Sequence, residues 1–181
     1  MRIYFICFSL FTNAVFFSQI DQDYTNYVNP LIGTNSSHEL SRGNTYPAIA
    51  LPWGMNFWTP QTGTMGDGWI YTHKNSGIVG IRQTHQPSPW INDYGAFSIM
   101  ASKGKLKLLE NDRKVAYKNE IVKPHHYKVK LIDSGITIEI APTRSSAHFR
   151  LSSDNMENVN IIVDAFFKGS SIEINPQKNI I

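Results

Sequence analysis

The sequence is short of cysteine, of long apolar runs and of charge of one dominant sign. Cys7 is the only cysteine among 181 residues, which excludes a disulfide framework and a cysteine zinc site. No apolar run reaches the about 20 residues that a membrane-spanning helix needs. Lys and Arg number 17 against 14 Asp and Glu, and this scattered excess argues against a nucleic-acid partner. We therefore expect a globular domain that its apolar core holds together.

The N-terminus has the pattern of a secretory signal peptide. Arg2 precedes the apolar run "IYFICFSLFTNAVFF", and Ser18 is a small residue at the expected cleavage point. We expect residues 1–18 to be removed, which leaves residues 19–181 with no thiol nucleophile and no stable membrane insertion. A retained anchor is the alternative. The pattern predicts a secreted protein, in the periplasm or on the outer surface of a Gram-negative bacterium.

Four successive β-strands are predicted in the C-terminal half. In "HHYKVKLID" and "GITIEIAPT" every second residue is apolar, and Asp133-Ser134-Gly135 between them is typical of a tight turn. The segments "AHFRLS" and "NVNIIVDAFF" continue the pattern. We therefore expect these four segments to follow one another as antiparallel strands.

The middle of the chain predicts further short strands in "GWIYTH", "GIVGIRQ", "YGAFSIMAS" and "KLKLLE". Lys103, Lys105 and Lys107 alternate with other residues and are expected on the solvent face of a strand. No window outside the N-terminal run has a helical apolar period. The fold class is therefore all-β, an antiparallel sandwich or barrel. The segment from Asn29 to Gly68 has little alternation and is predicted to be an ordered, irregular, aromatic-rich binding face.

All four tryptophans, Trp53, Trp58, Trp69 and Trp90, lie in the first half of the chain among amide, carboxylate and histidine side chains. Sugar rings stack on indoles and need such polar groups for their hydroxyls, so this mixture favours a carbohydrate ligand. Tryptophans also fill sandwich cores. We predict that Trp53 and Trp69 belong to the core, and that Trp90, next to Pro89 and a polar loop, faces a ligand.

No residue is assigned a catalytic role. His73 and His85 have no zinc-binding pattern around them, and hydrogen-bonded structural roles are expected for both. Glycosidases generally use two carboxyl groups about 5–10 Å apart. Glu39, Asp67 and Asp93 are candidates for such a pair, but turn roles account equally well for Asp67 and Asp93.

Four stretches, in this order, carry a resemblance to a known family: "YVNPLIGT", "GNTYPAIALPWGM", "GIRQTHQPSPWINDYGAFSIM" and "IEIAPTRSSAHFRLS". Over about residues 27–165 the chain resembles the N-terminal domain of glycoside hydrolase family 92, which comprises secreted, calcium-dependent, exo-acting α-mannosidases. The resemblance implies an antiparallel β-sandwich, mannose-containing glycans as partners, and a helical (α/α)₆ domain after it. That helical domain would carry the catalytic acid and base and most of the Ca²⁺ site.

The resemblance also implies which residues surround the sugar. The "GNTYP", "LPWGM" and "THQPSPWINDYG" stretches would close one side of the mannose pocket, with His85, Trp90 and Asp93 at its rim. The chain departs from the family where it reads "GIRQTHQPS" in place of "GFSHTHLSG", and "PAI" in place of "PGA".

Residues 19–181 are expected to be an incomplete sandwich, truncated at its C-terminal end, with the catalytic domain absent. Two other interpretations stay open. The first is a stand-alone carbohydrate-binding module, in which Trp90 and its neighbours bind glycan without chemistry. The second is an inactive structural fragment.

Overall fold

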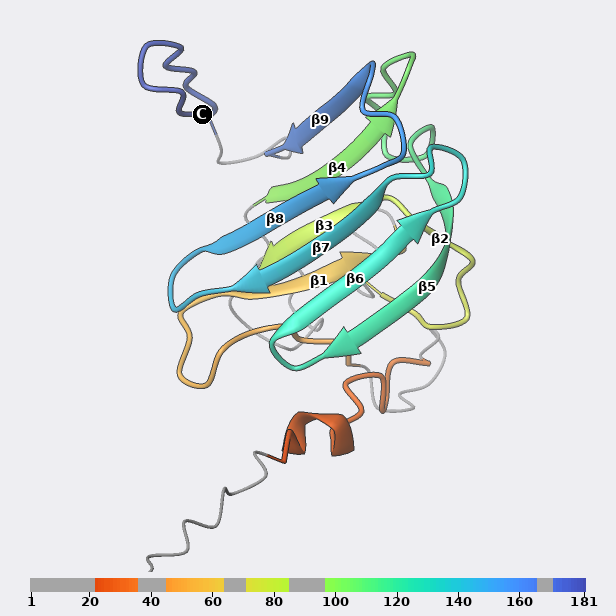
Figure 1. The fold of residues 1–181 in the computed structure, drawn as a ribbon, viewed down its shortest axis with the longest axis vertical. Coiled ribbons are helices and arrows are strands. Elements are labelled where there is room, and N and C mark those ends of the chain that lie inside the picture. Colours follow the sequence, from red (N-terminus) through yellow and green to blue (C-terminus); the bar gives the residue numbers. More distant parts are fainter. Residues whose placement is uncertain (1–21, 36–44, 64–70, 85–96, 166–170) are drawn as a thin grey trace, which may run out of the picture.

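The computed structural model describes residues 22–35, 45–63, 71–84, 97–165 and 171–181. Two antiparallel sheets pack face to face as a β-sandwich, which confirms the predicted fold class (Figure 1). The four-stranded sheet has the order β1-β3-β4-β9 and the five-stranded sheet β2-β5-β6-β7-β8. One 3₁₀ turn, η1 (Tyr24–Tyr27), precedes the sandwich. The strands are β1 (Phe57–Gln61), β2 (Gly77–Ile78), β3 (Gly80–Thr84), β4 (Phe97–Lys103), β5 (Val115–Lys123), β6 (His126–Leu131), β7 (Thr137–Pro142), β8 (Ala147–Ser152) and β9 (Val159–Asp164).

The four strands predicted in the C-terminal half are confirmed as β6 to β9. Strands β6 and β7 alternate as expected, because their inward side chains meet the other sheet while Lys and Thr face outward. Gly135, with φ at +68°, lies in the turn between them. The inward residues of this part are the centre of the core: Tyr127, Val129, Leu131, Ile136, Ile138 and Ile140.

The segment "GIVGIRQ" forms two strands in different sheets. Strand β2 pairs with β5, whereas β3 pairs with β1 and β4, so the chain crosses between the sheets at Val79. Both strands and Val79 are almost entirely buried, and the buried residues include the charged Arg82. A Cβ at Gly80 would lie 3.2 Å from the Ser98 hydroxyl, so the close approach of β3 to β4 favours glycine there.

Two of the predicted strands are wrong. The segment "KLKLLE" lies in the connection between β4 and β5, and its leucines are exposed because no second sheet covers them. Lys105 and Lys107 are therefore loop residues, and only Lys103 belongs to a strand. The described part of "GWIYTH" is not a strand either: the Thr72 N–H donates to the Thr62 hydroxyl at 2.9 Å instead of to a ladder.

Two strands were not expected from the sequence. Strand β1 lies inside the segment predicted to be irregular. Its Pro60 argues against a strand in the sequence, because proline cannot donate a ladder hydrogen bond, but a sheet edge such as β1 tolerates it. Most residues of strand β5 are exposed or half-buried, and its register against β6 shifts between Lys118 and Ile121. Asn119 has φ at +55° within that bulge, so the two halves of β5 show no common alternation.

Within the described ranges, the structure holds no helix with the length and apolar character that a membrane span requires.

Candidate functional site

The candidate functional site lies at one end of the sandwich, where segments distant in sequence meet (Figure 1). The register pairs Phe57 with Thr84, so β1 begins beside the point where β3 ends. The turn between β7 and β8 is at the same end: the Met55 N–H donates to the Arg144 carbonyl at 2.6 Å, and the Asn56 side-chain amide contacts the Thr143 carbonyl at 3.4 Å. The chain leaves β3 at this end toward the loop that the sequence singled out.

The three predicted pocket residues, His85, Trp90 and Asp93, lie outside the described residues, as does Trp69. The structure does describe the two strands from which their loop departs. Strand β3 ends at Thr84 and β4 begins at Phe97, and Gln83 pairs with Phe97 in the ladder. The loop is thus rooted on two adjacent, hydrogen-bonded strands.

A cavity of about 500 Å³ lies between the sheets beside the root of this loop. Its aromatic lining has a defined geometry, because the Trp58 ring meets Phe97 and Phe149 edge to face, with ring centroids 5.6 and 4.9 Å apart. The Trp58 indole N–H donates to the Asn56 side-chain oxygen, which fixes the ring. The lining residues are Asn56, Trp58, Gln83, Phe97, Ile99, Ser145, Ser146, Ala147 and Phe149.

The chemistry of this cavity suits a neutral, hydroxylated ligand. Aromatic rings offer apolar faces, and the Asn, Gln and Ser side chains offer hydrogen-bond donors and acceptors. None of the described residues that line the cavity is a carboxylate or a histidine. The described lining therefore offers apolar surface and neutral hydrogen-bonding groups, and it includes no general acid or base.

Trp53 corrects a prediction from the sequence. It is 95% exposed, not part of the core, and its φ of +59° is in the left-handed region that bulky residues avoid. The conformation is fixed locally: the Gly54 N–H donates to the Leu51 carbonyl at 2.9 Å, and Met55 is held by the turn between β7 and β8. Hydropathy placed Trp53 in the core, whereas this short turn directs its indole into solvent.

We expect Trp53→Gly to leave the free energy of unfolding unchanged or to raise it by up to about 1.5 kcal/mol. Glycine removes a left-handed strain of about 1–2 kcal/mol, and its greater freedom in the unfolded chain offsets about 0.5–1 kcal/mol of that gain. Urea unfolding monitored by circular dichroism measures the difference. A loss greater than about 1 kcal/mol would show that the indole packs in the folded protein and would contradict the exposure described above.

Tyr46, from the "GNTYP" motif, connects that motif to the root of the predicted loop. Its hydroxyl lies 3.4 Å from the Thr84 hydroxyl, one residue before His85. Burial raises the pKa of Tyr46 to about 12, although the contact with Thr84 acts against that rise. Tyr46 is therefore neutral at physiological pH and holds the loop root through a hydroxyl–hydroxyl contact.

Tyr46 packs against Tyr71, which belongs to a second hydrogen-bonded group at the side of the sandwich. The Tyr127 hydroxyl donates to the Glu120 carboxylate at 2.9 Å, and the Tyr71 hydroxyl donates to the same carboxylate at 3.4 Å. Burial, followed by the charge of Glu120, raises the pKa of both tyrosines. The bulge at Asn119 lies next to Glu120, so the irregularity in β5 accompanies the placement of this carboxylate.

The His73 Nδ1 lies 3.4 Å from the Tyr71 hydroxyl, which agrees with the predicted structural role of His73.

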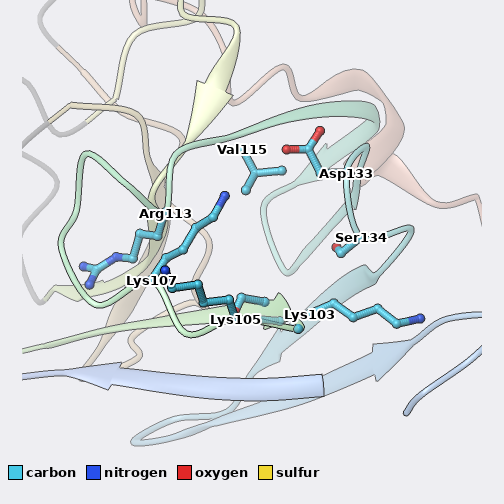
Figure 2. A pocket seen from close by; sticks show the side chains of 10 residues that line it. Lys103, Lys105, Lys107, Arg113, Val115, Asp133 and Ser134 are labelled. Carbon is cyan, nitrogen blue, oxygen red and sulfur yellow. The ribbon is translucent and has the colours of Figure 1, made fainter. Parts of the chain in front are cut away.

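A second cavity, of about 210 Å³, lies at the opposite end of the sandwich (Figure 2). Lys103 at the end of β4 and Lys105 and Lys107 from the connection between β4 and β5 line it. Asp133 and Ser134 from the turn between β6 and β7 line it as well. Arg113 also lines it, but its guanidinium is engaged by the Val79 and Leu108 carbonyls and by Asp164. No aromatic ring is among the described lining residues, so this cavity is the poorer candidate for a sugar.

No metal site emerges from the part of the chain that the structure describes. Nowhere in it do three or more His, Cys, Asp or Glu side chains gather. We assign none of the described residues as a calcium ligand.

The fold and the cavity define an antiparallel β-sandwich domain with an aromatic and amide-lined site at one loop end. The family model described as the glycosyl hydrolase family 92 N-terminal domain matches residues 27–181, and the chain belongs to this family. The predicted resemblance is thereby confirmed.

Solved structures of family members are similar to this chain. The family GH92 inverting mannosidase BT2199 from Bacteroides thetaiotaomicron is 49% identical, with a TM-score of 0.79 over 85% of this chain and 21% of its own. The family GH92 α-mannosidase BT3965 from the same bacterium is 28% identical, with a TM-score of 0.67 over 78% and 20% of the two chains. The GH92 family glycosyl hydrolase ccman5, at 19% identity and a TM-score of 0.65 over 79% of this chain and 20% of its own, shares the fold. The chain thus spans about a fifth of the length of these relatives. A search of curated proteins gave no significant match.

Proposed function

We propose that this domain forms one side of the mannoside-binding pocket of a secreted α-mannosidase, and that hydrolysis requires a helical catalytic domain. The observation that carries the proposal is the cavity at the root of the 85–96 loop, in a chain that belongs to this family. Trp58, Phe97 and Phe149 offer apolar surface for a sugar ring, and Asn56 and Gln83 offer amides for its hydroxyls. His85, Trp90 and Asp93 remain the proposed rim of the pocket.

The roles of the sandwich and of the helical domain in this proposal follow from the chemistry of glycoside hydrolysis. An inverting glycosidase needs one carboxylic acid to protonate the leaving oxygen and one carboxylate to activate water on the opposite face of the sugar. BT2199 is described as inverting, and the described lining of the cavity contains no carboxyl group. In the proposal, the sandwich binds the ring, orients it and excludes water, while both carboxyl groups come from the helical domain. Ca²⁺ would also be held mainly there.

Co-expression with the remaining four fifths or so of BT2199 tests this proposal. The 181-residue chain alone should not hydrolyse α-mannobiose, with or without calcium. The co-purified complex should hydrolyse it, and chelation of calcium should remove the activity. Enzyme-like turnover by the purified chain alone would overturn the proposal, as would a stable but inactive complex.

A further inference from the structure

We propose that Leu51, Trp53 and Met55 form a docking surface for the helical catalytic domain, with the Trp53 indole as its anchor. This inference rests on the proposed function, because it takes that domain as the partner. All three side chains are exposed, and they alternate along one short segment next to the cavity.

The surface is rigid, which suits docking. The Ala50 N–H donates to the Pro124 carbonyl at 2.8 Å, so the segment is tied to the turn between β5 and β6. The Met55 N–H is tied to the turn between β7 and β8 through Arg144. A Cβ at Gly54 would meet the Leu51 carbonyl oxygen at 3.0 Å, so the tight turn favours glycine. The indole is therefore presented on a fixed backbone, which lowers the conformational entropy lost on binding.

The backbone at Trp53 is strained for a reason that the isolated domain does not supply. A non-glycine residue in the left-handed region carries a cost, and the exposed indole gains no packing to offset it. Such outliers cluster at binding and switch regions, where the surrounding structure holds them in place. Here the strained conformation directs a large aromatic side chain outward, where a partner can cover it.

A protein partner fits this surface better than a sugar does. The neighbours of Trp53 in this surface, Leu51 and Met55, are apolar, whereas a sugar needs several polar groups around the ring on which it stacks. Tryptophan and methionine are enriched in protein interfaces, and central tryptophans often dominate their binding energy.

The remaining part of the related enzymes, in which we place the helical catalytic domain, is the partner to which the comparisons point. The related chains continue for about four times the matched length, so a large part of each relative lies beside or beyond its sandwich. The surface of Leu51, Trp53 and Met55 is at the same end as the cavity and the root of the 85–96 loop. A domain that docks there would lie next to Asn56, a lining residue of the cavity.

The test is co-purification of the tagged 181-residue chain with the remaining part of BT2199. We expect Trp53→Gly and Trp53→Asn to reduce the captured amount at least tenfold, because both residues tolerate the left-handed backbone and remove only the indole. Met156→Ala is the matched control. Met156 is an exposed methionine between β8 and β9, at the far end of the sandwich, and its loss should leave capture unchanged.

The outcomes separate this inference from the proposed function. If the Trp53 variants capture the helical part as well as the wild-type chain does, the docking surface is wrong, and mannosidase activity of that complex would leave the proposed function intact. If the wild-type chain captures nothing, the docking surface is also wrong. If the Trp53 variants lose capture while the wild-type chain and the Met156→Ala control keep it, the docking surface is supported. Calcium-dependent activity of the wild-type complex then supports the proposed function as well.

Discussion

Arg113→Ala should lower the free energy of unfolding by about 3–5 kcal/mol, since it breaks a buried, charged hydrogen-bond network. The Arg113 side chain is 1% exposed and joins three parts of the fold. Its Nε donates to the Val79 carbonyl at 3.0 Å, and one terminal nitrogen donates to the Leu108 carbonyl at 2.9 Å. The other contacts the carboxylate of Asp164 in β9.

The size of this loss follows from what remains after the substitution. Two backbone carbonyls lose a donor and the Asp164 carboxylate loses its cation, each within a half-buried or buried region. Arg150→Ala is the matched control, because Arg150 is 78% exposed and pairs with Glu139 on the surface. That control should cost about 1 kcal/mol or less. Equal losses for the two variants in urea unfolding would contradict the structural role of Arg113.

Trp58→Ala should also cost about 3–5 kcal/mol, as expected for truncation of a large buried aromatic side chain. Trp58 is 4% exposed, and its ring is the centre of the contact with Phe97 and Phe149. Its removal would also leave the Asn56 side-chain oxygen without the indole N–H. Trp58→Phe keeps an aromatic ring in the cavity wall and should cost clearly less.

Urea unfolding of the two Trp58 variants measures this difference. Ligand binding by the complex with the helical domain supplies a second measurement, since the same ring lines the cavity. A Trp58→Ala variant as stable as the wild type, with unchanged binding, would show that this ring is neither a core residue nor a wall of the pocket.

The parts of the fold that alternate strictly were predictable from the sequence. Strands β6 and β7 alternate because one face of their sheet is buried and the other is solvated. Strand β5 escaped prediction because a bulge at Asn119 breaks its period. Strand β1 escaped because Pro60 is unusual in a strand and tolerated only at an edge.

The candidate site was predictable only through its loop motifs. Phe97 and Phe149 are far apart in the sequence and meet at Trp58 because two sheets pack together, and no local pattern encodes that meeting. The exposure of Trp53 depends on a four-residue turn and on a contact with a distant hairpin. Hydropathy suggests a core position for tryptophan, and it carries no information about this turn or about the contact with the hairpin. The predicted roles of His85, Trp90 and Asp93 stay predictions.

In the proposed function, this domain supplies one side of a mannoside pocket and not a complete binding site. Titration of α-mannobiose against the purified 181-residue chain, followed by tryptophan fluorescence, tests it most directly. We expect no saturation up to millimolar sugar for the chain alone, and saturable binding once the helical domain is present. A micromolar dissociation constant for the chain alone would contradict it and would favour a stand-alone carbohydrate-binding module.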